Sequence, residues 1–191
     1  MNAFIEQEPF VVKSVVGGEF PSLFESEEAA PAEEHLLQRL DNMPAGALLV
    51  IDFQGVRISS EAARQLLRRA IRRVTGGELP DRYFVVRSLG RSRYNVEVMA
   101  ESEDITLVER TDEGKGGQLV GKVEPAMRET YEFLLTRSTV TAKEVFEHFG
   151  LNSVSAATNR LTSLAKAALV RRVAEQPVAG GGKQFVYAAA R

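Results

Sequence analysis

The sequence contains no cysteine and no tryptophan, and its two histidines, His35 and His148, lie far apart. The absence of cysteine excludes a disulfide framework, a thiolate metal site and a thiol nucleophile. The distance between the histidines in sequence weakens any histidine-based metal or catalytic site. No apolar run approaches the roughly 20 residues of a membrane-spanning helix, and the N-terminal residues lack the pattern of a secretory signal. These absences predict a cytoplasmic protein with no membrane contact.

The sequence also lacks a recognisable catalytic arrangement. Asp52 and Glu61 are a possible carboxylate pair, but positions at a strand end and a helix start account for both. No Ser-His-Asp arrangement or metal-ligand spacing is present. The glycines at 114, 116 and 117 lack the strand-to-helix context of a phosphate loop, so a hairpin turn explains them better. We therefore expect neither an enzyme nor a bound cofactor.

The charges are unevenly distributed along the chain. The 191 residues carry 24 Lys and Arg against 26 Asp and Glu, a formal net charge of -2. Residues 1–34 have a net charge of -7, whereas residues 151–191 have a net charge of +5. Such asymmetry is typical of a chain with one nucleic-acid-binding part, although basic residues that merely solvate a surface explain it equally well. The small total is therefore no argument against a nucleic-acid partner.

The first two thirds of the chain alternate between strand-like and helical patterns, which predicts a small α/β layer. Residues 10–16 are predicted as a strand, residues 19–31 as a loop with a short helix, and residues 32–43 as a helix that begins after Pro31. The apolar run 47–53 predicts a buried strand, and Ser59 or Ser60 caps a helix over residues 61–74. The remaining predicted elements are a strand over residues 83–87, a helix over 92–102 with Tyr94, Val98 and Met99 facing inward, and hairpin strands over 105–109 and 118–123.

From Glu124 the pattern changes to three helices followed by a hairpin. Met127, Tyr131, Leu134 and Leu135 mark the first helix. Thr141 and Glu144 form a capping box for the second, and Gly150 suits its C-terminal end. A third helix begins at Ser153 or Ser155, and its expected apolar face consists of Val154, Ala157, Leu161, Leu164 and Ala168. Strands over residues 169–173 and 185–187 flank a flexible tip at 180–183.

This order of elements resembles a winged helix-turn-helix domain over roughly residues 124–189. The resemblance is carried by TAKEVFEHFGL at 141–151, NRLTSL at 159–164 and LVRR at 169–172. It implies that the third helix enters the major groove of DNA and that the wing contacts a phosphate or the minor groove. Ala168 stands where many such domains have glycine. A winged helix that serves only protein contact or dimerisation is the alternative.

The residues of the third helix support the same interpretation. With its apolar positions in the core, the opposite face presents short polar side chains and one cation, which suit base edges and phosphates. Asn159 suits adenine, and the N–H groups at the helix start suit a phosphate. Arg171 and Arg172 point to opposite faces of a strand, so at most one faces DNA. The candidate DNA-binding residues are Asn152, Ser153, Ser155, Ala156, Asn159, Arg160, Thr162, Ser163, Lys166, Arg172 and Lys183.

Residues 50–62, VIDFQGVRISSEA, resemble the signature of STAS-type domains, which occur in sulfate transporters and anti-sigma-factor antagonists. The chain is more similar to STAS-like domains of unknown function that lie next to winged helices in bacteria and archaea. The resemblance implies a phosphorylated serine at the helix start, here Ser59 or Ser60, although Ile58 replaces the usual acidic residue. Helix capping by these serines is the simpler interpretation.

Five arginines, Arg64, Arg68, Arg69, Arg72 and Arg73, follow on the predicted helix 61–74. They form either a second nucleic-acid surface or, more simply, a solvated face that pairs with the acidic residues 19–34.

Together these patterns predict a mixed α/β chain with a STAS-like domain over 10–123 and a winged helix-turn-helix domain over 124–191. The acidic N-terminal strand and loop region over 1–34 is expected to be part of the first domain. We expect a bacterial or archaeal transcriptional regulator that binds double-stranded DNA, forms a homodimer, and receives a protein partner or small ligand at the STAS-like domain. The alternative is a partner-switching signalling protein of the anti-sigma-factor-antagonist type, regulated by serine phosphorylation and binding protein in place of DNA.

Overall fold

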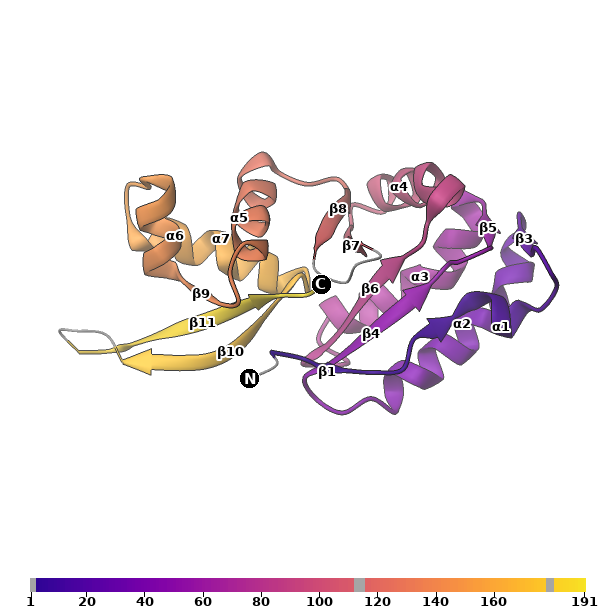
Figure 1. The fold of residues 1–191 in the computed structure, drawn as a ribbon, viewed down its shortest axis with the longest axis horizontal. Helices are drawn as coiled ribbons and strands as arrows, with labels where there is room; N and C mark the ends of the chain where they lie inside the picture. Colours follow the sequence, from indigo (N-terminus) through magenta and orange to yellow (C-terminus); the bar gives the residue numbers. More distant parts are fainter. Residues whose placement is uncertain (1–2, 112–115, 178–180) are drawn as a thin grey trace. The chain divides into compact units, whose positions relative to one another are not determined.

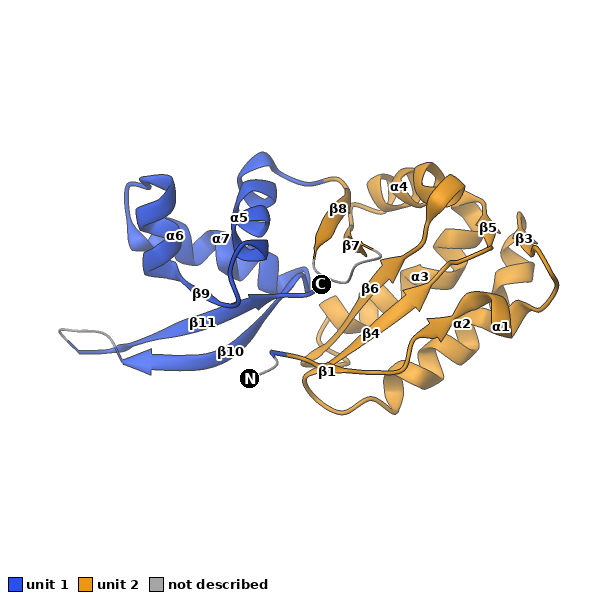
Figure 2. Cartoon of the chain, viewed as in Figure 1, with its two compact units in different colours: residues 1–3, 123–190 blue, residues 4–122, 191 orange. Residues whose placement is uncertain are grey.

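The computed structural model describes residues 3–111, 116–177 and 181–191, which form two compact units (Figure 2). One unit spans Phe4–Lys122, and the other spans Val123–Ala190 and includes Ala3. The division falls beside residue 124, where the sequence pattern changes. Helices and a mixed sheet occur together, so the predicted mixed α/β class is confirmed. None of the described helices is long and apolar enough to cross a membrane.

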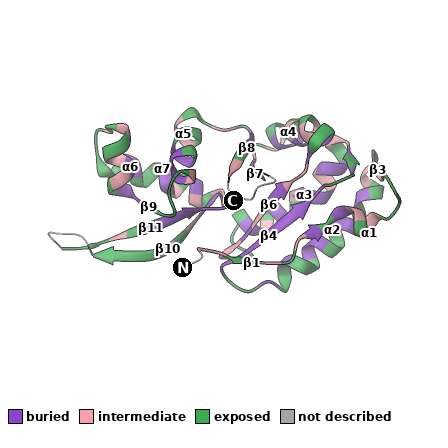
Figure 3. Ribbon diagram, viewed as in Figure 1, coloured by how far each residue is buried: buried purple, intermediate pink, exposed green. Residues whose placement is uncertain are grey.

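The unit Phe4–Lys122 is built on a sheet with the strand order β1-β4-β6-β7-β8 (Figure 1). Its last two strands form the antiparallel hairpin that the sequence predicts, whereas the other neighbours along the order are parallel. All of β4 is buried, which confirms the strand predicted from the apolar run (Figure 3). The strands are β1 (Ile5–Glu6), β4 (Ala47–Asp52), β6 (Arg82–Arg87), β7 (Thr106–Arg110) and β8 (Gly117–Gly121), and β2 (Phe10–Val11) pairs with β4.

Three helices join the parallel strands of this unit: α2 (Ser26–Asp41), α3 (Ser60–Thr75) and α4 (Arg93–Ser102). α2 packs on α3, and α3 packs on α4. Ser59 is the N-cap of α3, as predicted, and its hydroxyl oxygen accepts a hydrogen bond from the N–H of Ala62. The smaller elements are α1 (Val12–Val16), the parallel pair β3 (Ser22–Leu23) and β5 (Arg57–Ile58), and the 3₁₀ turn η1 (Gly90–Ser92).

The strand predicted over residues 10–16 is confirmed only at Phe10–Val11 and is wrong from Val12 onward. The strand ends at Val11, and Val12–Val16 form the short helix α1. The N–H of Gly17 donates to the carbonyl of Lys13 and closes this turn. Val12 is fully buried, so packing of one side chain outweighs the β-propensity of the segment.

The predicted start of the next helix after Pro31 is also wrong, because α2 begins at Ser26. The carboxylate of Glu28 accepts hydrogen bonds from the N–H groups of Phe24 and Glu25, at 2.7 and 3.1 Å, and completes a capping box. Pro31 lies inside the helix and leaves the carbonyl of Glu27 without a helical donor. Glu27 is exposed to solvent, where water can hydrogen-bond to that carbonyl.

The inward face predicted for α4 is partly wrong. Tyr94 and Val98 are 73% and 37% exposed, whereas Met99 is buried, as predicted, together with Val96. The buried hydroxyl of Ser92 sets the rotation of the helix, because it accepts from the N–H of Ile58 and donates to the carbonyl of Val56.

In the unit Val123–Ala190, three helices precede a long hairpin (Figure 1). The sequence predicts this order but not the two-residue strand β9, which pairs with β11 and completes a three-stranded antiparallel sheet. The hairpin strands also extend beyond their predicted ends. The elements are α5 (Pro125–Leu135), β9 (Val140–Thr141), α6 (Ala142–Phe149), α7 (Val154–Lys166), β10 (Val170–Pro177) and β11 (Lys183–Ala189).

Local signals fix the helix ends in this unit. Thr141 and Glu144 form the predicted capping box, and Gly150 has the left-handed conformation expected after a helix, with φ of 57°. Ser153, one of the two serines proposed, caps α7. The predicted core position of Val154 is wrong, because its side chain is 44% exposed at the first turn of the helix.

Two predicted turns fall partly on positions outside the described residues. These are the glycine-containing turn around Gly114 and the start of the hairpin tip at Gly180.

Candidate functional site

α7 separates a buried face from an exposed polar face. Ala157, Leu161 and Leu164 have no exposed surface and face the core of the unit. At 3.6 residues per turn, the opposite side carries one stripe of short polar side chains that ends in a lysine. The exposed members of the stripe are Ser155, Asn159, Ser163 and Lys166, and the half-buried Ala156 and Thr162 lie at its edges. The exposed Asn152 precedes the helix.

The N-terminus of α7 begins with a capping serine. The Ser153 hydroxyl accepts a hydrogen bond from the N–H of Ala156 at 3.2 Å. The side chains of Asn152, Ser153 and Ser155 are exposed around this first turn. The positive end of the helix dipole therefore faces solvent among small polar groups, which is a suitable arrangement for a phosphate.

Arg160 supports the helix from its flank. Its guanidinium carbon lies 5.2 Å from the ring centroid of Phe149, and its Nη1 lies 3.5 Å from the hydroxyl oxygen of Thr130. These contacts join α7 to α6 and α5. Arg160 therefore packs within the unit. Its contacts with Phe149 and Thr130 could not be predicted from the sequence, because they join separate elements.

The base of the hairpin places a further cation on its surface. The guanidinium of Arg172 lies 4.5 Å from the ring centroid of Phe185 and 5.9 Å from that of Tyr187, on the neighbouring strand. Arg171 instead donates to the carbonyl of Ala3 at 2.6 Å. The two arginines thus have different partners, as alternation along a strand predicts. The alternating aromatic residues at 185 and 187 were the signal for this stacking.

Lys183, predicted at the wing tip, begins β11 and is 74% exposed in its side chain. Its ammonium lies 3.1 Å from the carboxylate of Glu175 on β10. An exposed pair of this kind contributes at most about 1 kcal/mol. The lysine can therefore leave Glu175 for a phosphate at little cost.

The segment that builds this surface contains no acidic residue. Residues 148–174 include no Asp or Glu but contain Arg160, Lys166, Arg171 and Arg172. Within the described part of the chain, neither Lys166 nor Arg172 has an ion-pair partner. α7 and the hairpin base therefore form a polar surface of net positive charge.

The two serines at the start of α3 have different environments. The hydroxyl of Ser59 donates a hydrogen bond to the carbonyl of Phe24 at 2.6 Å and accepts one from the N–H of Ala62. Both hydrogen bonds hold the local backbone in place. Ser60 is the first residue of the helix and is half-buried. These contacts favour the capping role for Ser59.

The arginines of α3 form ion pairs within their own unit. The Nε atoms of Arg64 and Arg68 each lie 2.9 Å from the carboxylate of Glu103, and Nη2 of Arg72 lies 3.7 Å from it. The Nε–H groups of Arg64 and Arg68 do not form hydrogen bonds, so these contacts are ion pairs. Arg69 pairs with Glu33, and Arg73 pairs with Asp41 and Glu78. Of these carboxylates, Glu33 alone belongs to residues 19–34, whose acidic groups were the expected partners. The ion pairs explain this arginine run without a nucleic acid.

No protein-family model, curated protein or solved structure matches this chain. Among the described residues, no group of three or more His, Asp or Glu side chains could hold a metal ion. The candidate site therefore rests on the geometry of α7 and the hairpin.

Proposed function

We propose that the unit Val123–Ala190 binds double-stranded DNA and that the protein is a transcriptional regulator. The observation that carries the proposal is the exposed, acid-free polar face of α7 beside the cationic base of the hairpin. The order α5-β9-α6-α7-β10-β11, with β9 paired to β11, supports a winged helix-turn-helix assignment. In that arrangement α7 is the reading helix and the β10–β11 hairpin is the wing.

The proposed contacts follow from the chemistry of each exposed side chain. Asn159 can donate to and accept from one adenine in the major groove. The start of α7 at Ser153 and the ammonium of Lys166 bind phosphates on either side of the reading face. Arg172 and Lys183 contact the backbone from the hairpin. Arg160, held against Phe149 and Thr130, positions α7.

A homodimer and a sensory unit complete the proposal. One reading helix covers a short half-site, and a dimer doubles the contacts across two half-sites. The unit Phe4–Lys122, with its resemblance to STAS-like domains, then serves assembly or the sensing of a signal.

The test measures the affinity of the full chain for duplexes of mixed sequence by fluorescence anisotropy at several salt concentrations. Three cationic phosphate contacts per protomer, from Lys166, Arg172 and Lys183, predict a loss of at least roughly 40-fold in affinity between about 50 and 200 mM salt, and more for a bound dimer. Affinity that does not change with salt, or no binding at low salt, would contradict the proposal. Phosphate incorporation at Ser59 or Ser60 by a kinase, together with no DNA binding, would favour the partner-switching alternative.

Matched lysine variants locate the interface. Lys166→Gln is expected to weaken binding to all sequences and to reduce the salt slope by about one unit for each bound protomer. Lys143→Gln removes the same charge from α6, where Lys143 pairs with Glu147, and is expected to leave the affinity unchanged. Equal effects of the two variants would show that binding reflects net charge and not the face of α7.

Asn159→Ala tests base recognition separately. We expect it to cost about 1–3 kcal/mol of discrimination at one base pair and to leave the salt slope unchanged. Selection of bound fragments from random duplexes with both proteins would reveal a relaxed position. Identical sequence preferences for Asn159→Ala and the unchanged protein would exclude Asn159 as a base contact.

A further inference from the structure

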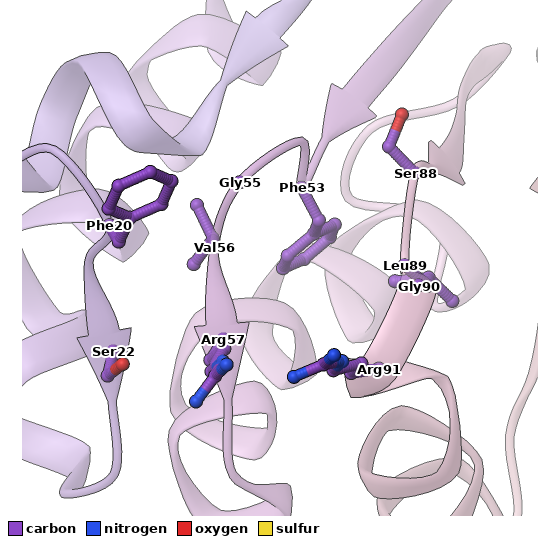
Figure 4. A pocket seen from close by; sticks show the side chains of 10 residues that line it. All are labelled: Phe20, Ser22, Phe53, Gly55, Val56, Arg57, Ser88, Leu89, Gly90 and Arg91. Carbon is purple, nitrogen blue, oxygen red and sulfur yellow. The ribbon is translucent and has the colours of Figure 1, made fainter.

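A cavity of about 480 Å³ lies beyond the carboxyl ends of β4 and β6 (Figure 4). The loops that follow these strands, residues 53–56 and 88–91, supply most of its wall, and Phe20, Ser22 and Arg57 supply the rest. A second cavity of about 250 Å³ shares Arg57 and Arg91 with the first. The carboxyl end of parallel strands is the usual position of ligand sites in α/β sheets.

Arg57 and Arg91 differ from the other arginines of this unit. In the described part of the chain, neither guanidinium has a carboxylate or carbonyl partner, and both residues are exposed. Figure 4 shows the side chain of Arg91 extending from its loop toward the strand that carries Arg57. The arginines of the unit that do have such partners are Arg39, Arg64, Arg68, Arg69, Arg72, Arg73, Arg82, Arg87, Arg93 and Arg110.

A third cation lies beside the same cavity. The ammonium of Lys13 is 5.5 Å from the ring centroid of Phe20 and would lie 3.9 Å from a Cβ atom on Gly55. Phe20 and Gly55 both line the cavity. Arg57, Arg91 and Lys13 together raise the positive electrostatic potential in the cavity, which favours an anionic ligand.

The cavity also offers apolar surface. Phe53 and Leu89 line the cavity but are 0% and 1% exposed, so its accessible apolar surface comes from Phe20, which is 77% exposed at the edge. A volume of this size suits a small molecule. The planar fork of arginine matches phosphate oxygens, and an exposed aromatic ring suits an apolar or aromatic group attached to that phosphate.

We propose that this cavity binds a small organic phosphate. The phosphate lies between the guanidinium groups of Arg57 and Arg91, Lys13 adds attraction, and the organic group packs on Phe20. The site belongs to the unit Phe4–Lys122 and does not depend on DNA binding by the rest of the chain.

The test titrates the full chain with phenyl phosphate, inorganic phosphate and phenol by isothermal titration calorimetry. Phenyl phosphate is expected to bind more tightly than either fragment. The double variant Arg57→Gln/Arg91→Gln is expected to weaken phenyl phosphate binding at least about tenfold, since it removes charge-assisted hydrogen bonds. Phe20→Ala is expected to reduce the affinity for phenyl phosphate to that for inorganic phosphate.

Arg72→Gln is the matched control, because Arg72 is on α3 and pairs with Glu103. It is expected to leave phenyl phosphate binding unchanged. Absence of saturable binding at millimolar phenyl phosphate, or an equal loss in the Arg72→Gln control, would overturn the proposal. If circular dichroism shows that the double glutamine variant is unfolded, Arg57→Lys/Arg91→Lys replaces it as the test. Weakened binding of phenyl phosphate there would support contact with the planar arginine forks, and full retention of affinity would overturn the proposed contact with Arg57 and Arg91.

Discussion

Ala168 follows α7 with a φ of 56°, in the left-handed region that favours glycine. The N–H of Leu169 donates to the carbonyl of Leu164, and the N–H of Ala168 donates to the carbonyl of Ala165, each at 3.0 Å. These two bonds form a Schellman motif, which requires a left-handed residue after the helix. A glycine would adopt this conformation without the steric cost that the Cβ atom of Ala168 imposes.

Ala168→Gly is expected to raise the free energy of unfolding by about 0.5–1 kcal/mol. The left-handed conformation costs an alanine about 1–2 kcal/mol, and part of that gain is lost to the greater backbone entropy of unfolded glycine. Denaturant titration of the full chain measures the change. Ala167→Gly is the control: the φ of Ala167 is -79°, so this variant should be less stable. Destabilisation by Ala168→Gly would contradict the assignment.

Asp52 lies at the carboxyl end of β4 and is 3% exposed. One of its carboxylate oxygens is 2.7 Å from Nη2 of Arg87, and the other accepts from the N–H of Gln54 at 3.0 Å. Burial raises the pKa of Asp52, but the hydrogen bonds from Arg87 and Gln54 outweigh it, so the net pKa lies below its ordinary value. The ionised form is therefore the stabilising one.

Because the pKa of Asp52 is lowered in the folded state, its ionised carboxylate stabilises the fold at pH values above the ordinary pKa of about 3.9. That stabilisation is lost as the pH falls through the folded-state pKa. At neutral pH, Asp52→Asn is expected to cost about 1.5–3 kcal/mol of unfolding free energy. The difference from the unchanged protein should shrink below about pH 4. Denaturant titrations across this range measure it, with the exposed Asp104→Asn as control. A constant difference at all pH values would refute the role of the carboxylate charge.

At the scale of elements, α3 and α4 are joined by one acidic group. Arg64, Arg68 and Arg72 recur every four residues and so form one row on α3. Glu103 follows the end of α4, and its side chain is 16% exposed. A single carboxylate thus offsets the repulsion among three guanidinium groups.

Glu103→Gln is expected to lower the free energy of unfolding by about 1–2 kcal/mol, because the arginine row loses its counter-charge. The loss should diminish as added salt screens the repulsion. Denaturant titration at low and high ionic strength measures both effects, and Glu101→Gln on the exposed side of α4 is the control. Equal stability of the two variants at low salt would contradict this role for Glu103.

At the scale of the whole molecule, the acidic N-terminal residues are part of the unit Phe4–Lys122. β1 and β2 both pair with β4, and Glu6 pairs with Arg110. Glu28 caps α2, and the buried Glu33 accepts a hydrogen bond from Gln65. Several of these acids therefore hold the sheet and α2 in place.

Deletion of residues 1–31 is expected to abolish cooperative unfolding of this unit, because it removes β1, β2, α1, β3 and residues 26–31 of α2. Thermal denaturation followed by circular dichroism, with protease digestion and mass spectrometry of the fragments, measures the loss. A variant that deletes only residues 1–3 is the control. If residues 32–122 of the truncated chain resist protease as well as they do in the full chain, this role of the N-terminal elements is contradicted.

The sequence alone determined the elements whose signals lie within a few residues. Capping by Ser59 and Thr141, the stop at Gly150 and the buried run of β4 are all local, so they could be predicted. The polar face of α7 follows from helical periodicity in the same way. The inward face of α4 depends on Ser92, which bonds to residues more than 30 positions away, and was therefore predicted incorrectly in part.

Only the tertiary structure decided which charged groups have partners. Arg160 meets Phe149 and Thr130, and the arginines of α3 meet Glu103, through packing between separate elements. The same packing leaves Arg57 and Arg91 at one cavity without a carboxylate in the described residues. Periodicity specifies which face a side chain occupies, but ion pairs and cavities depend on distances between residues far apart in the chain.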